Sequence, residues 1–231
     1  RYGVPSRIIL AIWARESGYG AARIPNDALR TLATRAFMGT RRDFFAEETV
    51  AALQILADRH IGRADLRSSW GGALGQPQFL PSSFLRLAVD FDGDGHRDLI
   101  NNPVDAIGSV ANYFKQHGWQ AGAPVASLAR YLGDNTGAEQ LQAVLHRGPK
   151  PQKPNLTILE IKQAGLIADA SDDTHYRDSD KATAMAFAGA EGEEFWIGLQ
   201  NFYVITRYNH SPLYAMAVYQ LSEELKRRLS S

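Results

Sequence analysis

The chain has 231 residues, 22% of them charged, and its 25 basic side chains balance its 25 acidic ones. Such a length can bury roughly 70% of the unfolded surface, and the charge balance gives no support for a nucleic-acid partner or an acidic tail. No cysteine is present, which excludes disulfides, thiolate metal sites and a cysteine nucleophile. No apolar run reaches about 18 residues, so we expect a soluble segment whose amino terminus, which lacks Met, is a trimmed boundary.

The first predicted helix covers residues 4–15, where apolar side chains recur at helical spacing. Pro5 suits its first turn, and Gly18 and Gly20 suit its end. Glu16 shares the apolar face, so we expect its side chain to point inward or into a cleft. Apolar surroundings and the negative end of the helix dipole both favour the protonated acid, which a general acid requires. The alternative is an exposed Glu paired with a nearby arginine.

A second amphipathic helix is predicted over residues 46–61, with Val50 and Leu53 in its apolar pattern and Gly62 just beyond its end. Residues 41–43 are expected to form an exposed segment that leads into this helix.

The clearest predicted helix begins after Asn102, which is a suitable cap, and has Pro103 in its first turn. Asp105 would face the positive end of the helix dipole, and Gly118 would close the helix. A last helix is predicted over residues 211–228, ending in three basic residues.

Two breaks precede the last helix. Prolines space out a linker over residues 147–154, and residues 169–180 are polar. We therefore expect a small lobe between the helical parts, and a fold that is mainly α in the α+β class. The expected division is a helical core over residues 1–148, a small mixed α/β lobe over residues 149–206, and a C-terminal helix over residues 207–231 that returns to the core.

Within this lobe, residues 183–187 and 202–206 favour strands because they are rich in strand-forming side chains. Residues 157–160 fit a capping box that opens a short helix.

A glycine-rich segment follows the second predicted helix, over residues 68–75. Closely spaced glycines let main chain approach a flat ligand such as a sugar ring, and Gln78 can donate and accept hydrogen bonds to an acetamido group or a hydroxyl. The alternative is a plain connector, in which residues 81–83 are ordinary start signals for a helix.

An acidic loop has the spacing of a calcium-binding loop. Carboxylates stand at positions 1, 3, 5 and 9, which are Asp90, Asp92, Asp94 and Asp98. Gly95 stands at position 6, and His96 at position 7 would contribute its backbone carbonyl. Asn101 stands at position 12, where the usual residue is Glu, so Asp105 is the expected closing carboxylate. We expect a structural calcium ion, with sodium as the alternative occupant, because the carboxylates would otherwise repel one another. A solvated acidic turn is the reading without a metal.

In this order the motifs resemble the membrane-bound lytic murein transglycosylase B family, over nearly the whole chain from Val4 to about Leu225. The segments that carry the resemblance are residues 16–18, 72–83, 90–98, 102–114 and 205–211. The resemblance implies a lysozyme-like core around Glu16 and the glycine-rich segment. It also supports Asp105 as the closing ligand of the acidic loop.

The resemblance implies that Glu16 is the only catalytic acid and base, with Ser69 and Gln78 lining a sugar groove. Further substrate-binding residues would face the groove from the other side: Tyr208, Asn209 and Tyr214. From residue type alone, a loop beside a helix start can present an aromatic ring and an amide, whereas Tyr214 fits a core position better. This chain has Ser17-Gly18 where family members commonly have Thr-Arg, and Pro77 where they have Gly. These departures touch the groove wall, so they bear on subsite preference more than on the chemistry.

Two-carboxylate glycosidases place a second acid across the bond, but no second acidic residue stands in a comparable motif. The resemblance implies cleavage between N-acetylmuramic acid and N-acetylglucosamine of peptidoglycan, assisted by the acetamido group and ending in a 1,6-anhydro ring, with no cofactor in the chemistry. The alternatives are a hydrolytic muramidase and a non-catalytic glycan-binding module. The family also implies a bacterial periplasmic or outer-membrane-associated protein, a monomer, with a lipid anchor or envelope partners lying outside this chain.

Overall fold

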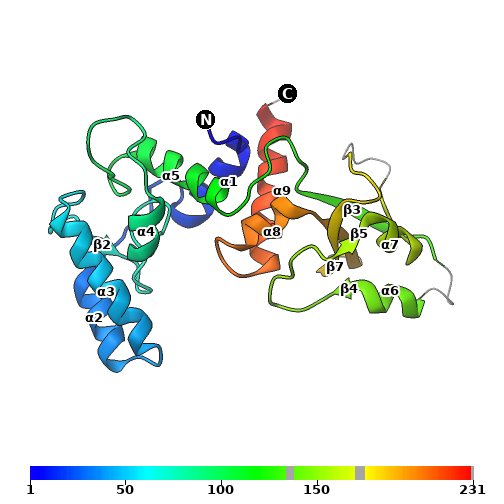
Figure 1. The fold of residues 1–231 in the computed structure, drawn as a ribbon, viewed down its shortest axis with the longest axis horizontal. Helices are drawn as coiled ribbons and strands as arrows, with labels where there is room; N and C mark the ends of the chain where they lie inside the picture. The colour runs from blue at the N-terminus through cyan, green and yellow to red at the C-terminus, as the bar shows by residue number, and fades with distance from the viewer. Residues whose placement is uncertain (134–137, 170–174, 230–231) are drawn as a thin grey trace. The chain divides into compact units, whose positions relative to one another are not determined.

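The computed structural model describes residues 1–133, 138–169 and 175–229. They form two compact units, Arg1–Gln116 and His117–Ser231. The first unit is helical and the second carries a sheet (Figure 1), so the expected mainly α, α+β class is confirmed. The expected boundaries after residues 148 and 206 both fall within the second unit, and the three-part division stays a prediction.

The first unit contains five helices and one pair of very short antiparallel strands, in the order α1 (Ser6–Ser17), β1 (Asn26–Asp27), α2 (Ala28–Met38), α3 (Arg42–Ala57), β2 (Arg67–Ser68), α4 (Pro81–Leu87) and α5 (Pro103–Gln116). Its core is built from large apolar side chains with no exposed surface, among them Ile8, Ile12, Leu32, Ile55, Phe84 and Phe114. These side chains come from α1 to α5, so the core joins all the helices of the unit.

Helix α1 begins directly after Pro5 and ends where expected. Gly18 has a left-handed φ of 55°, and its N–H donates to the carbonyl of Ala14. The next N–H, of Tyr19, donates to the carbonyl of Trp13. This is the usual glycine-terminated helix end, and it confirms the sequence signal.

Helix α3 differs from its prediction at both ends. It begins at Arg42, so residues 42 and 43 belong to the helix and not to its approach, although residues 41–43 are all exposed as expected. It ends at Ala57. Arg59, with a φ of 57°, makes the turn that was assigned to Gly62. Val50 and Leu53 are 66% and 50% exposed. Of the expected apolar pattern, Ile55 is buried. The rest of the buried face is formed by residues outside that pattern: Phe45, Glu48, Ala51 and Ala52.

Helix α2 was not predicted, although its cap is readable in the sequence. The Asp27 side chain accepts a hydrogen bond from the Arg30 N–H at 2.9 Å, as an N-cap residue does. Helix α4 takes its cap from another helix. The buried Glu48 carboxylate on α3 accepts hydrogen bonds from the Ser82 N–H at 2.9 Å and the Ser82 hydroxyl at 2.7 Å.

Helix α5 is confirmed as predicted. The Asn102 side chain accepts a hydrogen bond from the Val104 N–H at 3.0 Å, and Pro103 opens the first turn. Gly118, with a φ of 90°, follows two residues after its end.

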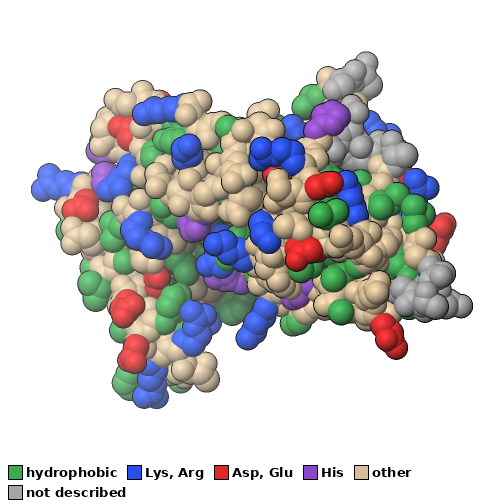
Figure 2. Space-filling model, turned by 45° about the vertical axis from the view of Figure 1, so that its right-hand side comes forward, with side chains coloured by type: hydrophobic (Ala, Val, Ile, Leu, Met, Phe, Trp, Pro, Cys, Tyr) green, Lys and Arg blue, Asp and Glu red, His purple; other side chains and the backbone are tan. Residues whose placement is uncertain are grey.

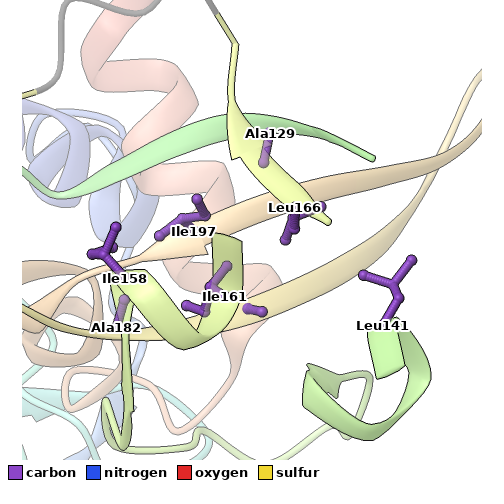
Figure 3. Close-up of a cluster of buried hydrophobic side chains, with 8 residues drawn as sticks. Ala129, Leu141, Ile158, Ile161, Leu166, Ala182 and Ile197 are labelled. Carbon is purple, nitrogen blue, oxygen red and sulfur yellow. The ribbon is translucent and has the colours of Figure 1, made fainter. Parts of the chain in front are cut away.

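The second unit contains the elements β3 (Ala126–Tyr131), α6 (Ala138–Val144), β4 (Leu145–His146), β5 (Leu156–Thr157), α7 (Ile158–Gln163), β6 (Leu166–Ala168), β7 (Lys181–Gly189), β8 (Gly192–Gly198), α8 (Gln200–Thr206) and α9 (Pro212–Leu229). The strand order is β4-β7-β8-β3-β6, with β5 also paired to β7. Only the β4 and β7 pair is parallel among the described strands. Helix α7 directs Ile158 and Ile161 into a cluster with Leu166 and Ile197 of the sheet (Figure 3).

Most predictions for this unit are confirmed. Thr157 and Glu160 form the expected capping box, β7 contains residues 183–187, and α9 covers the last predicted helix. The linker over residues 147–154 has no helix or strand. Part of the second predicted break, residues 170–174, lies outside the described residues.

The predicted strand over residues 202–206 is wrong, because these residues belong to helix α8. Phe202, Val204 and Ile205 favour strands intrinsically, but all three are buried in the helix. Burial in tertiary contacts therefore outweighs the local preference.

Basic and acidic side chains are interspersed on the face of the molecule that Figure 2 shows. This distribution agrees with the formal net charge of zero.

Replacing Glu48 with Ala removes the only acceptor that the described residues supply to the Ser82 N–H and hydroxyl. We expect the free energy of unfolding to fall by about 1–3 kcal/mol, measured by urea denaturation. The adjacent, exposed Glu47 is the matched control, and Glu47→Ala should change stability by less than about 0.5 kcal/mol. Equal losses from the two variants would contradict the capping role.

Candidate active site

Glu16 lies in the last turn of α1 and is half-buried. Ile12 and Ile9, one and two turns before it, are buried, and Ile12 has no exposed surface. The carboxylate therefore stands at the border between the apolar core and the surface, as expected from its position in the helix. A group placed there can reach a ligand while apolar side chains limit its access to water.

The turn after Glu16 is held in an unusual conformation. Gly18, Tyr19 and Gly20 have consecutive positive φ angles of 55°, 61° and 83°. Only the tyrosine is strained by this, since left-handed backbone costs non-glycine residues free energy. The buried Ser17 hydroxyl stabilises the turn, because it accepts a hydrogen bond from the Gly20 N–H at 3.0 Å and donates to the carbonyl of Trp13 at 3.3 Å.

Gln76 ties α1 to the glycine-rich segment, and sequence analysis missed it. Its side-chain oxygen accepts a hydrogen bond from the Trp13 indole N–H at 2.9 Å, and its amide donates to the carbonyl of Ile100 at 2.9 Å. Its backbone N–H donates to the carbonyl of Leu99 at 2.8 Å. A Cβ on Gly20 would lie 2.9 Å from the Gln76 side-chain oxygen. The turn after Glu16 and the glycine-rich segment are thus fitted to the same side chain.

The glycine-rich segment folds into a tight hairpin. Leu74 and Phe79 exchange two backbone hydrogen bonds of 2.6 and 3.0 Å. Gly72 and Gly75 have φ angles of 89° and 65°, and a Cβ on either would lie 2.4 Å from a neighbouring atom, the Leu32 side chain and the Leu99 carbonyl oxygen respectively. These two glycines are therefore explained by close packing within the protein.

Ser69 and Gln78, the two expected groove residues of this segment, are both half-buried. The Ser69 hydroxyl accepts a hydrogen bond from the Ala73 N–H at 3.2 Å, and the Gln78 amide donates to the carbonyl of Gly75 at 2.9 Å. Gln78 has a strained φ of 55°. Strain of this kind gathers at functional sites. Both side chains are fixed by the loop, and their binding of sugar stays a prediction.

The other three expected substrate residues lie in the second unit. Tyr208 and Asn209 are in the turn between α8 and α9, where Tyr208 is half-buried and Asn209 is exposed. Tyr214, in the first turn of α9, is buried with 7% of its surface exposed. Their contact with the same ligand as Glu16 stays a prediction.

The acidic loop between α4 and α5 brings three of its carboxylates together. Ligand oxygens of Asp90, Asp92 and Asp94 lie within 4.8 Å of one another, and no other group of this kind occurs within the described ranges. The N–H groups of Gly95, Gly93 and Asp94 donate to Asp90 and hold the pKa of that carboxyl below its usual value. An all-oxygen set of this kind suits calcium or sodium better than a transition metal.

Asp105 has a different place from its partners in the predicted metal site. Its carboxylate is fully buried and accepts hydrogen bonds from the N–H groups of Phe91 at 2.7 Å and Asp98 at 2.9 Å. Burial raises its pKa, although these hydrogen bonds act against the shift. Asp105 thus ties both ends of the loop to α5. Its role as a metal ligand, like that of the backbone carbonyl of the exposed His96, stays a prediction.

Comparison with known proteins identifies the class. The family described as Transglycosylase SLT domain matches residues 1–223. Membrane-bound lytic murein transglycosylase B of Escherichia coli (strain K12) is 40% identical over 223 residues, which is 96% of this chain and 57% of that protein. This chain thus spans little more than half of that relative.

Solved structures of lytic transglycosylases have the same fold. Soluble lytic transglycosylase SltB1 from Pseudomonas aeruginosa matches with a TM-score of 0.89 and 43% identity, over 100% of this chain and 73% of that one. Escherichia coli Slt35 in complex with calcium matches with a TM-score of 0.84 and 37% identity, over 100% of this chain and 69% of that one. SltB3 from Pseudomonas aeruginosa in complex with NAG-NAM-pentapeptide matches with a TM-score of 0.83 and 34% identity, over 98% of this chain and 58% of that one.

The fold is that of the lytic murein transglycosylases, with their lysozyme-like core. The chain belongs to the transglycosylase SLT domain family. The resemblance that its motifs indicated is therefore confirmed.

Replacing Gln76 with Leu keeps the size of the side chain but leaves the Trp13 indole N–H and the Ile100 carbonyl without this partner. We expect a loss of about 2 kcal/mol in the free energy of unfolding and faster solvent exchange of the Trp13 indole proton by NMR. Gln54→Leu, at an exposed position of α3, serves as the control and should leave that proton unchanged. Unaltered exchange in Gln76→Leu would contradict the bridge.

Proposed function

We propose that this chain cleaves the β-1,4 bond between N-acetylmuramic acid and N-acetylglucosamine in peptidoglycan and leaves 1,6-anhydromuramic acid ends. The observation that carries the proposal is the half-buried Glu16 at the end of α1, fixed beside the glycine-rich segment through Trp13 and Gln76. Membership of the family supports the reaction class. A relative crystallised with NAG-NAM-pentapeptide supports the substrate class.

A single carboxylate is sufficient for this reaction. Protonated Glu16 donates its proton to the glycosidic oxygen as the bond to the anomeric carbon breaks, and the muramic acetamido group stabilises that carbon. The ionised Glu16 then takes the proton of the C6 hydroxyl, whose oxygen bonds to the anomeric carbon and closes the anhydro ring. Glu16 regains its proton, and no water is consumed.

The other buried carboxylates of the described residues are already engaged. They belong to Glu48 and Asp105. Glu48 accepts two hydrogen bonds from Ser82, and Asp105 accepts the N–H groups of Phe91 and Asp98. Neither is free to activate water as the second carboxylate of a hydrolase would. This favours the anhydro-forming route over a hydrolytic muramidase.

For the substrate, we propose that Ser69 and Gln78 bind sugar groups beside Glu16. The Gln78 side-chain oxygen accepts no hydrogen bond from any residue in the described ranges, so an N–H or O–H of the ligand can donate to it. Tyr208, Asn209 and Tyr214 are proposed as further binding residues on the strength of the family motif.

We propose that the acidic loop holds a structural calcium ion. The clustered oxygens of Asp90, Asp92 and Asp94 fit such an ion, and a relative of the same fold is known in complex with calcium. The ion would offset the repulsion between these carboxylates and brace the loop between α4 and α5. The chemistry at Glu16 is proposed to need no cofactor.

We also propose action in the bacterial cell envelope, as a monomer, with any lipid anchor or envelope partner outside this chain. The curated relative is a membrane-bound enzyme by name. Among the described residues, none of the helices is both long and apolar enough to cross a bilayer.

The reaction is tested by mass spectrometry of the soluble products released from purified peptidoglycan. We expect muropeptides one water lighter than hydrolysis products, and their loss in Glu16→Gln but not in the exposed control Glu47→Gln. Products with reducing ends would instead establish a muramidase. Binding without products from the unaltered chain would establish a glycan-binding module.

The metal is tested by thermal unfolding after removal of divalent ions. Saturating calcium should raise the melting temperature of the unaltered chain by about 5 °C, and Asp90→Asn should abolish the shift. A shift with sodium alone would assign the site to sodium. A melting temperature that neither ion changes would mean that the loop is a solvated acidic turn without a bound metal.

A further inference from the structure

An arginine near the end of α2 lies against two aromatic rings beside the glycine-rich segment. The guanidinium carbon of Arg35 is 4.4 Å from the ring centre of Phe45 and 5.3 Å from that of Trp70. Phe45 is buried, whereas Trp70 is 77% exposed. The cation is thus held on one aromatic ring of the core and one of the surface.

No acceptor among the described residues takes a hydrogen bond from this guanidinium, and no carboxylate pairs with it. Its Nε atom is buried without a hydrogen-bond partner. Other arginines of the chain are paired, as Arg63 is with Asp27 at 2.6 Å and Arg147 with Glu193 at 2.8 Å. A partly desolvated cation without an anion is costly, and cation–π contact offsets only part of that cost. The site is therefore suited to an anion supplied by a ligand.

Trp70 directly follows Ser69 in the glycine-rich segment and is among the most exposed large apolar side chains of the described residues. Its loop is anchored, because Gly72 packs against Leu32 on α2, one helical turn before Arg35. A large flat ring kept at the surface of a well-anchored loop offers a platform for the apolar face of a sugar.

We propose that Arg35 and Trp70 form a subsite that recognises a carboxylate on the glycan strand. Trp70 stacks on a sugar ring while Arg35 binds the carboxylate carried by that ring or its substituent. The planar guanidinium can bind a carboxylate through two parallel N–H groups. This inference rests on the proposed function, since it takes the ligand to be peptidoglycan.

Peptidoglycan can supply the carboxylate from two sources. The lactyl ether of muramic acid carries a free carboxylate once its peptide is removed, whereas in intact material that group is an amide and the stem peptide carries the carboxylates. Oligomers of N-acetylglucosamine carry neither. Comparison of these three ligands therefore tests the charge and identifies its source.

The experiment measures dissociation constants in the Glu16→Gln background, so that binding is read without cleavage. The probes are soluble peptide-bearing glycan strands, the same strands with their stem peptides removed, and an N-acetylglucosamine oligomer. Arg35→Gln is compared with Arg30→Gln, which makes the same charge change at an exposed position of α2. Trp70→Ala is compared with Phe37→Ala, because Phe37 is 79% exposed on α2.

We expect Arg35→Gln to weaken binding of a carboxylate-bearing strand about tenfold and to leave the uncharged oligomer unaffected. Trp70→Ala should weaken all three ligands by a similar factor, since stacking does not depend on charge. Arg35→Lys should recover part of the affinity, because it keeps the charge but loses the planar fork. A loss on peptide-free strands alone assigns the lactyl carboxylate, and a loss on peptide-bearing strands alone assigns the stem peptide.

The proposal is overturned if Arg35→Gln matches Arg30→Gln on both charged ligands. It is also overturned if Arg35→Gln weakens the uncharged oligomer as much as the charged strands, which would indicate a structural role. Melting temperatures of all variants identify any loss of fold. Failure of the proposed function shows separately, as absence of anhydro products from the unaltered chain.

Discussion

The first unit depends on one buried amide. The Gln76 side-chain oxygen accepts a hydrogen bond from the indole N–H of Trp13 on α1, and its amide N–H donates to the carbonyl of Ile100 ahead of α5. The backbone N–H of Gln76 donates to the carbonyl of Leu99. Helix α1, the glycine-rich hairpin and the approach to α5 therefore share one set of hydrogen bonds. Because a buried amide is costly unless all its groups are paired, the three segments are held in a single arrangement. Glu16 lies in the last turn of α1, so this arrangement also holds it in place, as its proposed role as a general acid requires.

The two buried carboxylates of the described residues, Glu48 and Asp105, both accept hydrogen bonds from main-chain N–H groups. Glu48 caps a helix that has no capping side chain of its own, and Asp105 accepts two main-chain N–H groups from the acidic loop. Each replaces water at a main-chain donor that folding would otherwise leave unpaired. Glu16, by contrast, is only half-buried, which agrees with its proposed role at the ligand.

Sequence patterns predicted the features that depend on local chemistry. Gly18, the Asn102 cap and the Thr157–Glu160 capping box act within a few residues of themselves, so their outcome does not depend on the rest of the fold. Two of the failures depend on contacts distant in sequence. Residues 202–206 became a helix because they are buried in the core, and Gln76 carries no sequence signal because its partners are 63 and 24 residues away. For the candidate site, the sequence indicated Glu16 and the glycine-rich segment, but not Gln76, which joins that segment to α1.

The double anchor at Asp105 separates the two ends of the acidic loop from its tip. The ends are bonded to Asp105 of α5 through the N–H groups of Phe91 and Asp98, whereas Asp92, Asp94 and the glycines at 93 and 95 lie between them and are exposed. Loss of the proposed cation would then loosen the tip without releasing α5 from the core. A protease would then cut the chain at this exposed tip, and the nicked chain would keep its helices together, because both ends of the loop stay bonded to Asp105.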